Sequence, residues 1–177
     1  MSEEMLVCHC SPTLAGLKTG SLFSCPYSSQ KMIIKEIREF NQKLTQKGIR
    51  IIPVRISDKR MLVYVYRPEK LKEDFSDEKT QIILKCKGYD CTNLSQCICR
   101  LIQKLQSDPD FPHEIGLFLG YPAEDVKGFI ENKAACSKCS GCWKVYGDEQ
   151  AARILFKKYK KCTEIYCRRW KSGVAVE

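Results

Sequence analysis

Residues 49–68, IRIIPVRISDKRMLVYVYRP, decide the fold. The stretch is rich in isoleucine, valine and tyrosine, and its second half alternates in the way of a half-buried strand. Asp58 and Lys59 separate two such runs, which predicts a β-hairpin. Pro53 has no backbone N–H to offer a neighbouring strand, so the first run is predicted to be an edge strand or to carry a bulge.

The segments on both sides of the hairpin have the spacing of amphipathic helices. Within residues 28–48 apolar side chains recur at spacings of 1, 4, 3 and 4, which is one helical face, and Gly48 is suited to end the helix. These apolar side chains are Met32, Ile33, Ile37, Phe40 and Leu44. Helices are also predicted at 69–86 and 92–106, the second with Cys97 in its apolar stripe as a small hydrophobic residue.

The N-terminal segment is predicted to be a strand followed by a helix. Residues 5–8 form an apolar run that fits a short strand. Ser11 is a good N-cap and Pro12 suits the first helical position, so a short helix is predicted within residues 11–23.

The second half of the chain is also predicted to contain a strand followed by a helix. Residues 114–120 have no helical period and predict a buried strand. A helix is predicted to follow, with Pro122 near its start and acidic residues in its first turn, where the helix dipole favours them. Residues 142–147 are a further strand candidate, and Asp148 is suited to cap a final helix.

Together these elements predict a fold of the α/β or α+β class. A chain of 177 residues is a comfortable size for one domain, and we expect residues 1–177 to form a single domain around one core. The expected architecture is a mixed sheet with flanking helices. A long C-terminal helix at about 148–170 is expected to pack on or across it.

The composition excludes several classes of protein. Apolar residues make up 44% of the chain and charged residues 29%, near the averages for globular proteins, so wholesale disorder is not expected. No run approaches the roughly 18 apolar residues of a membrane span. The N-terminal MSEEMLVCHC lacks the basic and apolar regions of a secretory signal. We therefore expect a cytoplasmic protein without a membrane partner.

The net charge of +9 favours anionic partners, although its spread along the chain is also typical of a solubilising surface. One dense segment, KKYKK with CRRW further on, interleaves basic residues with Tyr159, Tyr166 and Trp170. Such a segment can bind phosphate backbones and stack on bases, so an RNA-binding module is one alternative. Leu155 and Cys162 share a helical face with the two tyrosines, however, which favours packing over nucleic-acid binding.

Cysteine is unusually frequent, at 12 of 177 residues. Without an export signal, reduced thiols, metal ligands or redox cysteines are favoured over a disulfide framework. Cys136, Cys139 and Cys142 have the C-x₂-C-x₂-C spacing of the first three ligands of an iron–sulfur run. These three residues are the candidate metal ligands.

Alternatives to a cluster remain open at these thiols. The fourth cysteine of the iron–sulfur run is missing, because position 146 is a tyrosine. A fourth ligand for iron–sulfur or zinc could come through the fold from Cys162, Cys167, His9 or His113. Cys139 and Cys142 could instead form a C-x-x-C redox pair, or the thiols could have no such role. In the CHC run, Cys8 and Cys10 would face one side of a strand and His9 the other, which disfavours a shared metal there.

Two segments, LVCHCSPTLAG and GLFLGYPAEDV, share the pattern strand, polar break, helix with an early proline. Ligands of open α/β sheets sit where such loops leave the strands, and free N–H groups at a helix start attract anions. The leading hypothesis is a small anionic ligand or a phosphate-bearing cofactor, of unknown identity, bound where the two loops meet. The candidate ligand-binding residues are Cys10, Ser11, Lys18, His113, Gly120 and Tyr121.

A catalytic role is left undecided. His113 and Glu114 are residue types that act as acid–base partners, but adjacent side chains in a strand point to opposite faces. The chain contains no G-x-S-x-G elbow, P-loop, G-x-G-x-x-G or H-E-x-x-H motif. No catalytic residue is therefore assigned, and the protein is classed neither as an enzyme nor as a non-enzyme.

Four quoted stretches carry a family resemblance. They are HCSPTLAGLKTGSLF at 9–23, VYRP at 65–68, HEIGLFLGYPAEDVKGFIENK at 113–133 and CWKVYGDEQAARILFKKYKKC at 142–162. Together they resemble a family of uncharacterised proteins from clostridia and related anaerobes, known only as a domain of unknown function. The resemblance implies a small cytoplasmic protein of an anaerobic bacterium, and it implies no activity, cofactor or catalytic residue.

Overall fold

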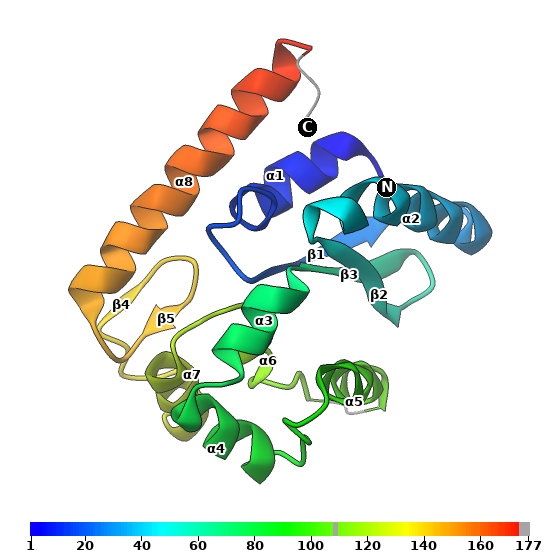
Figure 1. Ribbon diagram of the computed structural model, residues 1–177. Coiled ribbons are helices and arrows are strands. Elements are labelled where there is room, and N and C mark those ends of the chain that lie inside the picture. The colour runs from blue at the N-terminus through cyan, green and yellow to red at the C-terminus, as the bar shows by residue number, and fades with distance from the viewer. Residues whose placement is uncertain (108–109, 174–177) are drawn as a thin grey trace. The chain divides into compact units, whose positions relative to one another are not determined.

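The computed structural model describes residues 1–107 and 110–173 (Figure 1). Contacts within the chain divide it into two compact units. Unit 1 comprises Met1–Glu69 with Tyr159–Glu177, and unit 2 comprises Lys70–Lys158. The expectation of one domain over residues 1–177 stays a prediction.

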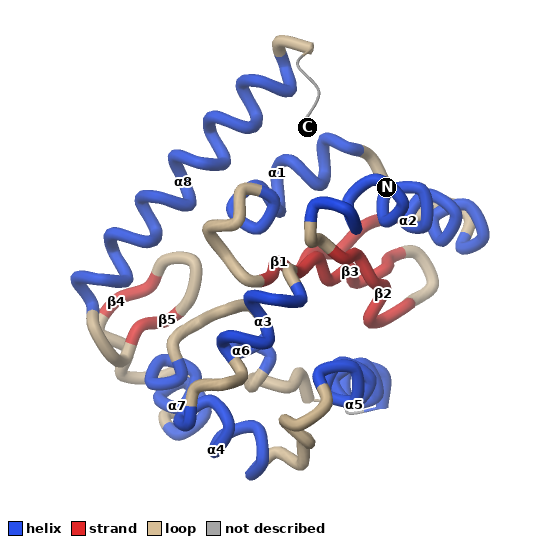
Figure 2. The backbone as a smooth tube through the Cα atoms, in the orientation of Figure 1, coloured by secondary structure: helices blue, strands red, loops and turns tan. Residues whose placement is uncertain are grey.

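Unit 1 is built on a three-stranded antiparallel sheet, drawn in red in Figure 2, with the strand order β1-β3-β2. Its elements are α1 (Glu3–Leu14), β1 (Gly20–Pro26), α2 (Gln30–Leu44), the 3-10 helix η1 (Thr45–Lys47), β2 (Arg50–Ile56) and β3 (Arg60–Tyr66). The predicted hairpin is β2–β3 and is confirmed. Both expectations for Pro53 are also confirmed, since β2 is an edge strand and its register shifts between Pro53 and Arg55.

The core of unit 1 lies on one face of this sheet. Met61, Val63 and Val65 of β3 point to that face because side chains alternate along a strand. Helix α1 packs against β1 and β3, and α2 packs against β2. Of the predicted apolar face of α2, Ile33 and Ile37 are buried and Phe40 and Leu44 are partly buried against the core, whereas Met32 is exposed. The core therefore depends on the hairpin that the sequence predicts.

The start of the chain differs from the prediction. Residues 5–8 are not a strand, and Ser11 does not cap a helix, because both lie inside α1. Ser2 is the N-cap, and its hydroxyl accepts a hydrogen bond from the Met5 N–H. Pro12 lies near the C-terminal end of α1, where its missing N–H removes one helical hydrogen bond without ending the helix. Consequently no strand precedes this helix, and the first expected strand–helix loop is absent from the described structure.

Arg67, in the VYRP motif, ties the end of β3 to the end of α1. Its guanidinium donates hydrogen bonds to the carbonyls of Thr13 and Leu14, and to that of Lys47. The last carbonyls of a helix have no partner within the helix, and a cation there also suits the helix dipole. Arg67 thus stabilises the C-terminus of α1.

Unit 2 is mainly helical. Its elements are α4 (Glu78–Cys86), α5 (Leu94–Ser107), α6 (Ile115–Phe118), α7 (Ala123–Glu131), β4 (Cys139–Ser140) and β5 (Lys144–Val145). Two further helices contribute to both units, α3 (Pro68–Asp74) and α8 (Glu149–Lys171). The helices predicted at 69–86 and 92–106 are thereby confirmed, the first as α3 and α4 in succession.

The segment 114–120 is buried as predicted, but it is not a strand. Ile115–Phe118 form the short helix α6, and Gly120 has a left-handed φ of 75°. An apolar run buried on every side has no period, so its sequence does not distinguish helix from strand. The second expected strand–helix loop is therefore a helix–helix turn.

The later elements agree with the sequence. Pro122 precedes α7, whose first turn carries Glu124 and Asp125. The β4–β5 hairpin provides a short strand within residues 142–147. Asp148 caps α8, since its carboxylate accepts a hydrogen bond of 3.0 Å from the Ala151 N–H.

The predicted fold class is confirmed as a mixture of helices and strands with a long C-terminal helix. The expected mixed sheet is not found within residues 1–107 and 110–173, because every strand pair described there is antiparallel. Among the helices so described, none has the length and apolar character needed to cross a membrane.

Candidate functional site

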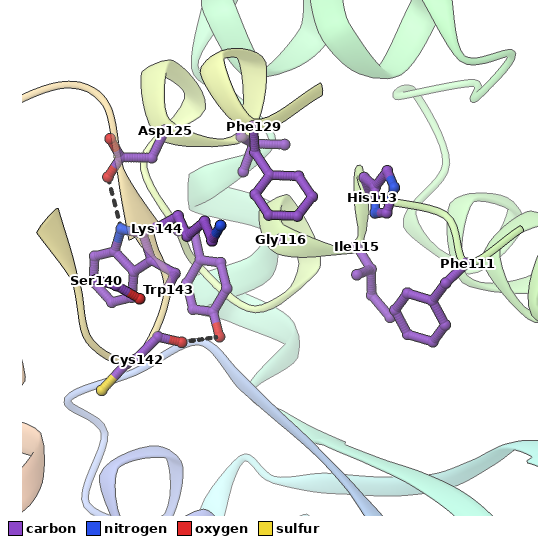
Figure 3. A pocket seen from close by; sticks show the side chains of 12 residues that line it. Phe111, His113, Ile115, Gly116, Asp125, Phe129, Ser140, Cys142, Trp143 and Lys144 are labelled. Carbon is purple, nitrogen blue, oxygen red and sulfur yellow. Dashed lines mark hydrogen bonds between the residues drawn. The ribbon is translucent and has the colours of Figure 1, made fainter. Parts of the chain in front are cut away.

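A cavity of about 310 Å³ lies within unit 2, between α6, α7 and the β4–β5 hairpin (Figure 3). Apolar and aromatic side chains form most of its wall, and a few polar groups open into it. The wall contains Phe111, Gly116, Tyr121, Val126, Phe129, Cys142 and Trp143, with the polar residues His113, Asp125, Ser140 and Lys144. This is the size range of small-molecule sites.

Asp125 fixes the hairpin side of the cavity. Its Oδ2 accepts a hydrogen bond of 2.7 Å from Trp143 Nε1, and its Oδ1 accepts bonds of 2.7 Å from the backbone N–H groups of Tyr146 and Gly147. The residue is only 3% exposed. A buried carboxylate is costly unless it is fully hydrogen-bonded, and three N–H donors meet that need.

The indole of Trp143 packs against two other aromatic rings. Its ring stacks on Tyr121 at 4.7 Å and meets the edge of Phe156 at 4.6 Å. The Tyr121 hydroxyl donates a hydrogen bond of 3.3 Å to the Cys142 carbonyl, marked in Figure 3. These contacts join the α6–α7 turn to the hairpin, so the aromatic wall is preorganised.

Two glycines permit the close packing around the cavity. A Cβ atom added at Gly128 in α7 would lie 2.4 Å from Cγ of Tyr146. One added at Gly116 in α6 would lie 2.7 Å from Cγ2 of Val126. Both distances are far inside van der Waals contact, so any larger residue would displace the hairpin or α7.

A second, larger hollow of about 630 Å³ adjoins the first, and the two share Phe111, His113 and Phe129 in their walls. Three lysines also line it: Lys87, Lys104 and Lys133. Two carboxylates, those of Asp110 and Glu114, also line this hollow. The second hollow is therefore more cationic than the first.

Glu114 is committed to a buried network at this hollow. Its Oε1 accepts hydrogen bonds from Lys104 Nζ at 2.7 Å and from the Tyr89 hydroxyl at 3.1 Å. Burial opposes ionisation of Glu114, but the Lys104 hydrogen bond and charge keep its pKa below the usual value. Burial, followed by the Glu114 charge, raises the pKa of Tyr89. Glu114 is thus an ionised structural group.

His113 and Glu114 make separate contacts, as expected, but for a different reason. The chain turns into α6 here, so that Glu114 reaches Lys104 while the His113 ring meets the edge of Phe129 at 5.0 Å. Of the two residues, His113 is the one that lines both hollows.

Of the six residues predicted to bind a ligand, three lie in unit 1 and three in unit 2. The three in unit 1 are Cys10, Ser11 and Lys18, of which Lys18 is half-buried in the turn after α1. Cys10 and Ser11 are fully buried in α1 of unit 1, and the Ser11 hydroxyl donates to the Val7 carbonyl one turn back. Burial raises the pKa of Cys10 to about 12, against the opposing charge of Lys18, so this thiol stays protonated. Both residues thus have packing roles in α1.

The other three predicted residues, His113, Gly120 and Tyr121, lie in unit 2. His113 and Tyr121 are in the wall of the 310 Å³ cavity, and Gly120 precedes Tyr121 in the turn beside it. The structure therefore brings this half of the predicted set together, although ligand binding itself stays a prediction.

The candidate metal ligands all lie near the hairpin of unit 2. Cys136 precedes β4 with a left-handed φ of 57°, Cys139 is in β4, and Cys142 is in the exposed hairpin turn. In the part of the chain that the structure describes, no group of three or more His, Cys, Asp or Glu residues is placed to hold a metal ion. The twelve cysteines all lie in the described residues, and none of them is in a disulfide. The metal and redox hypotheses stay predictions.

The alternative of RNA binding concerns α8. Tyr159 and Cys162 of its predicted packing face are buried, whereas most of its lysines and arginines are exposed. The tyrosine is therefore not available for stacking on a base. RNA binding by the exposed basic face stays a prediction.

Sequence reasoning missed Asp125, Phe129 and Trp143 as residues of this site. Asp125 was expected only to favour the start of a helix, and its role requires three donors from the hairpin. The signal that could have found it is the joint presence of Pro-Ala-Glu-Asp and Trp-Lys-Val-Tyr-Gly in the stretches that carry the family resemblance.

A family model, DUF3793, described as a protein of unknown function, matches residues 6–177. Neither the curated proteins nor the solved structures include a match to the chain.

Proposed function

Because the chain belongs to the DUF3793 family, whose description assigns no activity, we propose a function from the cavity alone. Unit 2 binds a small planar organic anion, of the class that includes phosphate-bearing cofactors. The observation that carries this proposal is the shared wall of an aromatic cavity and a lysine-lined hollow, through Phe111, His113 and Phe129.

The 310 Å³ cavity suits the planar part of such a ligand. Phe129 and Trp143 present aromatic surface, and the contacts of Trp143 with Asp125 and Tyr121 hold its ring in place without a ligand. A preorganised wall avoids the entropic cost of ordering side chains on binding. Stacking on such rings contributes about 1 kcal/mol beyond burial.

The larger hollow suits the anionic part. Lys104 is already paired with Glu114, which leaves Lys87 and Lys133 facing Asp110 in the wall. Lys133 and Ala134 also have left-handed backbone, with φ of 47° and 64°. This conformation costs roughly 1–2 kcal/mol per residue, and such cost is often concentrated at ligand sites.

The test uses two matched pairs of probes, AMP with adenosine and FMN with riboflavin, in thermal-shift and calorimetric titrations of the full chain. Within each pair the ring is the same and only the phosphate differs. We expect saturable binding of at least one phosphate-bearing probe and weaker binding of its partner, because only the former reaches the lysines. Absence of saturable binding for all four probes contradicts the proposal.

Two variants test which residues bind the ring of the probe and which bind its phosphate. Lys133→Ala is expected to weaken the phosphate-bearing probe about fivefold, for a loss of about 1 kcal/mol, and to leave its uncharged partner unchanged. Phe129→Ala is expected to weaken both. Lys157→Ala, an exposed lysine of α8 outside both hollows, is the matched control for charge. An equal loss in Lys157→Ala and Lys133→Ala would show that only net charge matters and would refute the site.

A further inference from the structure

Two thiols face each other in unit 1 although 159 residues separate them in the chain. Cys8 is on α1 and Cys167 is on the last turns of α8, and their Sγ atoms are 3.9 Å apart. Cys8 is exposed and Cys167 is half-buried, so small reagents reach the pair from solvent.

The pair is placed by the packing of two helices. Tyr159 and Cys162 of α8 are buried in unit 1, and the Tyr159 hydroxyl donates to the Leu17 carbonyl at 3.5 Å. One turn further, Tyr166 lines the same hollow as Leu6 and Val7 of α1. Cys167 is the next residue after Tyr166, so these contacts of α8 hold it opposite Cys8.

We propose that Cys8 and Cys167 are a redox-modification site, at which a reversible disulfide fastens α8 to α1. A disulfide has a sulfur–sulfur distance of about 2.05 Å, so the two Sγ atoms must approach by about 2 Å. Rotation of the exposed Cys8 side chain about its Cα–Cβ bond moves its sulfur on this scale, while both helices keep their places. The site is independent of the ligand cavity, which lies in unit 2.

The oxidant is a small-molecule disulfide, RSSR. The Cys8 thiolate attacks one sulfur of RSSR, forms a mixed disulfide and releases RS⁻. The Cys167 thiolate then attacks the Cys8 sulfur and releases the second RS⁻. The two protons of the protein thiols end on the two RS⁻ groups, so the protein loses two electrons and RSSR becomes two RSH.

The charges around Cys8 set the pH dependence of this step. Burial, then the hydrogen bond and charge of Cys167 and the charge of Glu4, raise the pKa of Cys8, while Lys171 opposes them. The thiolate is the attacking form, so its fraction at neutral pH is below that of an ordinary thiol. The rate of linkage therefore increases as the pH rises towards the raised pKa.

The test treats the reduced full chain with oxidised glutathione, blocks remaining thiols with iodoacetamide and maps the digest by mass spectrometry. We expect a linked peptide pair that contains Cys8 and Cys167, lighter than the two reduced peptides by two hydrogens, and lost on adding dithiothreitol. On a non-reducing denaturing gel the oxidised chain should migrate faster, because it carries a long closed loop.

Variants make the assignment specific. Cys8→Ser and Cys167→Ser each abolish the linked peptide and the mobility change, whereas Cys86→Ser, another exposed cysteine, retains both. Circular dichroism of each variant confirms that it folds. A Cys8 glutathione adduct that persists without closing onto Cys167, or a mobility change that survives in Cys8→Ser, would overturn the proposal.

Discussion

At the scale of single residues, Asp125 has the most consequential set of contacts in unit 2. One side chain satisfies the indole of Trp143 and two backbone N–H groups of the hairpin. Its neighbour Glu124 lies in the same first turn of α7 but is exposed, and it pairs with Lys79 at the surface. The two acids thus share a helix turn but differ in burial and in partners.

Asp125→Ala is expected to destabilise unit 2 by about 3 kcal/mol, because it leaves three donors without an acceptor. Glu124→Ala is the matched control and should cost less than about 1 kcal/mol, since an exposed ion pair contributes little. Urea unfolding followed by Trp143 fluorescence, in a Trp170→Phe background, measures both. Similar losses in the two variants would contradict the role given to Asp125.

The sequence could predict that Asp125 lies in the first turn of a helix but not what it binds. Helix starts favour acids through the dipole, which depends only on local sequence. The donors from Trp143 and Tyr146 lie about 20 residues further on, and their approach depends on the hairpin. Tyr121 is a candidate from the sequence because it lies in the Gly-Tyr-Pro break, which local sequence does reveal.

At the scale of elements, α7 lies very close to Tyr146, the residue that follows β5. Gly128 lies in α7, and the ring of Tyr146 occupies the space that a Cβ atom at this position would need. In an ordinary helix interior, replacing glycine by alanine stabilises by roughly 0.5–1 kcal/mol. Here the sign should reverse, because the methyl group would displace the hairpin.

Gly128→Ala is expected to destabilise unit 2 by about 2 kcal/mol, the usual scale of overpacking. Lys127→Ala, at the exposed neighbouring position of the same helix, should change stability by less than about 0.5 kcal/mol. Urea unfolding of both variants gives the comparison. A stabilised Gly128→Ala would show that α7 and the hairpin are not in contact at this point.

Elements were predictable where their apolar residues repeat with a clear period. The hairpin alternates and α2 has a single apolar face, so both followed from the sequence. Helix α6 is buried all round and has no period, and in α1 the Ser11-Pro12 signal lies at the end of a helix rather than its start. A serine before a proline is compatible with either end of a helix. Only the packing of α1 on β1 therefore determines that the helix ends near Pro12 and does not begin there.

At the scale of the whole molecule, unit 2 is an insertion between two parts of unit 1. The chain enters it after Glu69 and returns at Tyr159, within α8. A bond between Cys8 and Cys167 therefore encloses all of unit 2 in one covalent ring.

Closing a loop of 159 residues restricts the unfolded chain and should stabilise the oxidised protein by about 5 kcal/mol. The midpoints of unfolding in guanidinium chloride, followed by circular dichroism for the oxidised and reduced chains, measure this effect. Cys8→Ser under the same oxidising conditions is the control and should unfold as the reduced protein does. Equal midpoints for the oxidised and reduced wild type would contradict the expectation.

Because unit 1 is formed from both ends of the chain, the ribosome synthesises its two parts at different times. Residues 1–69 emerge first and can form the sheet with α1 and α2, but the half of α8 that carries Tyr159 and Cys162 is made only after unit 2. Until then the apolar surface that these side chains cover is open to water. A nascent chain halted before residue 159 should accordingly hold a complete unit 2 beside an unfinished unit 1, the arrangement that a chaperone would meet during synthesis.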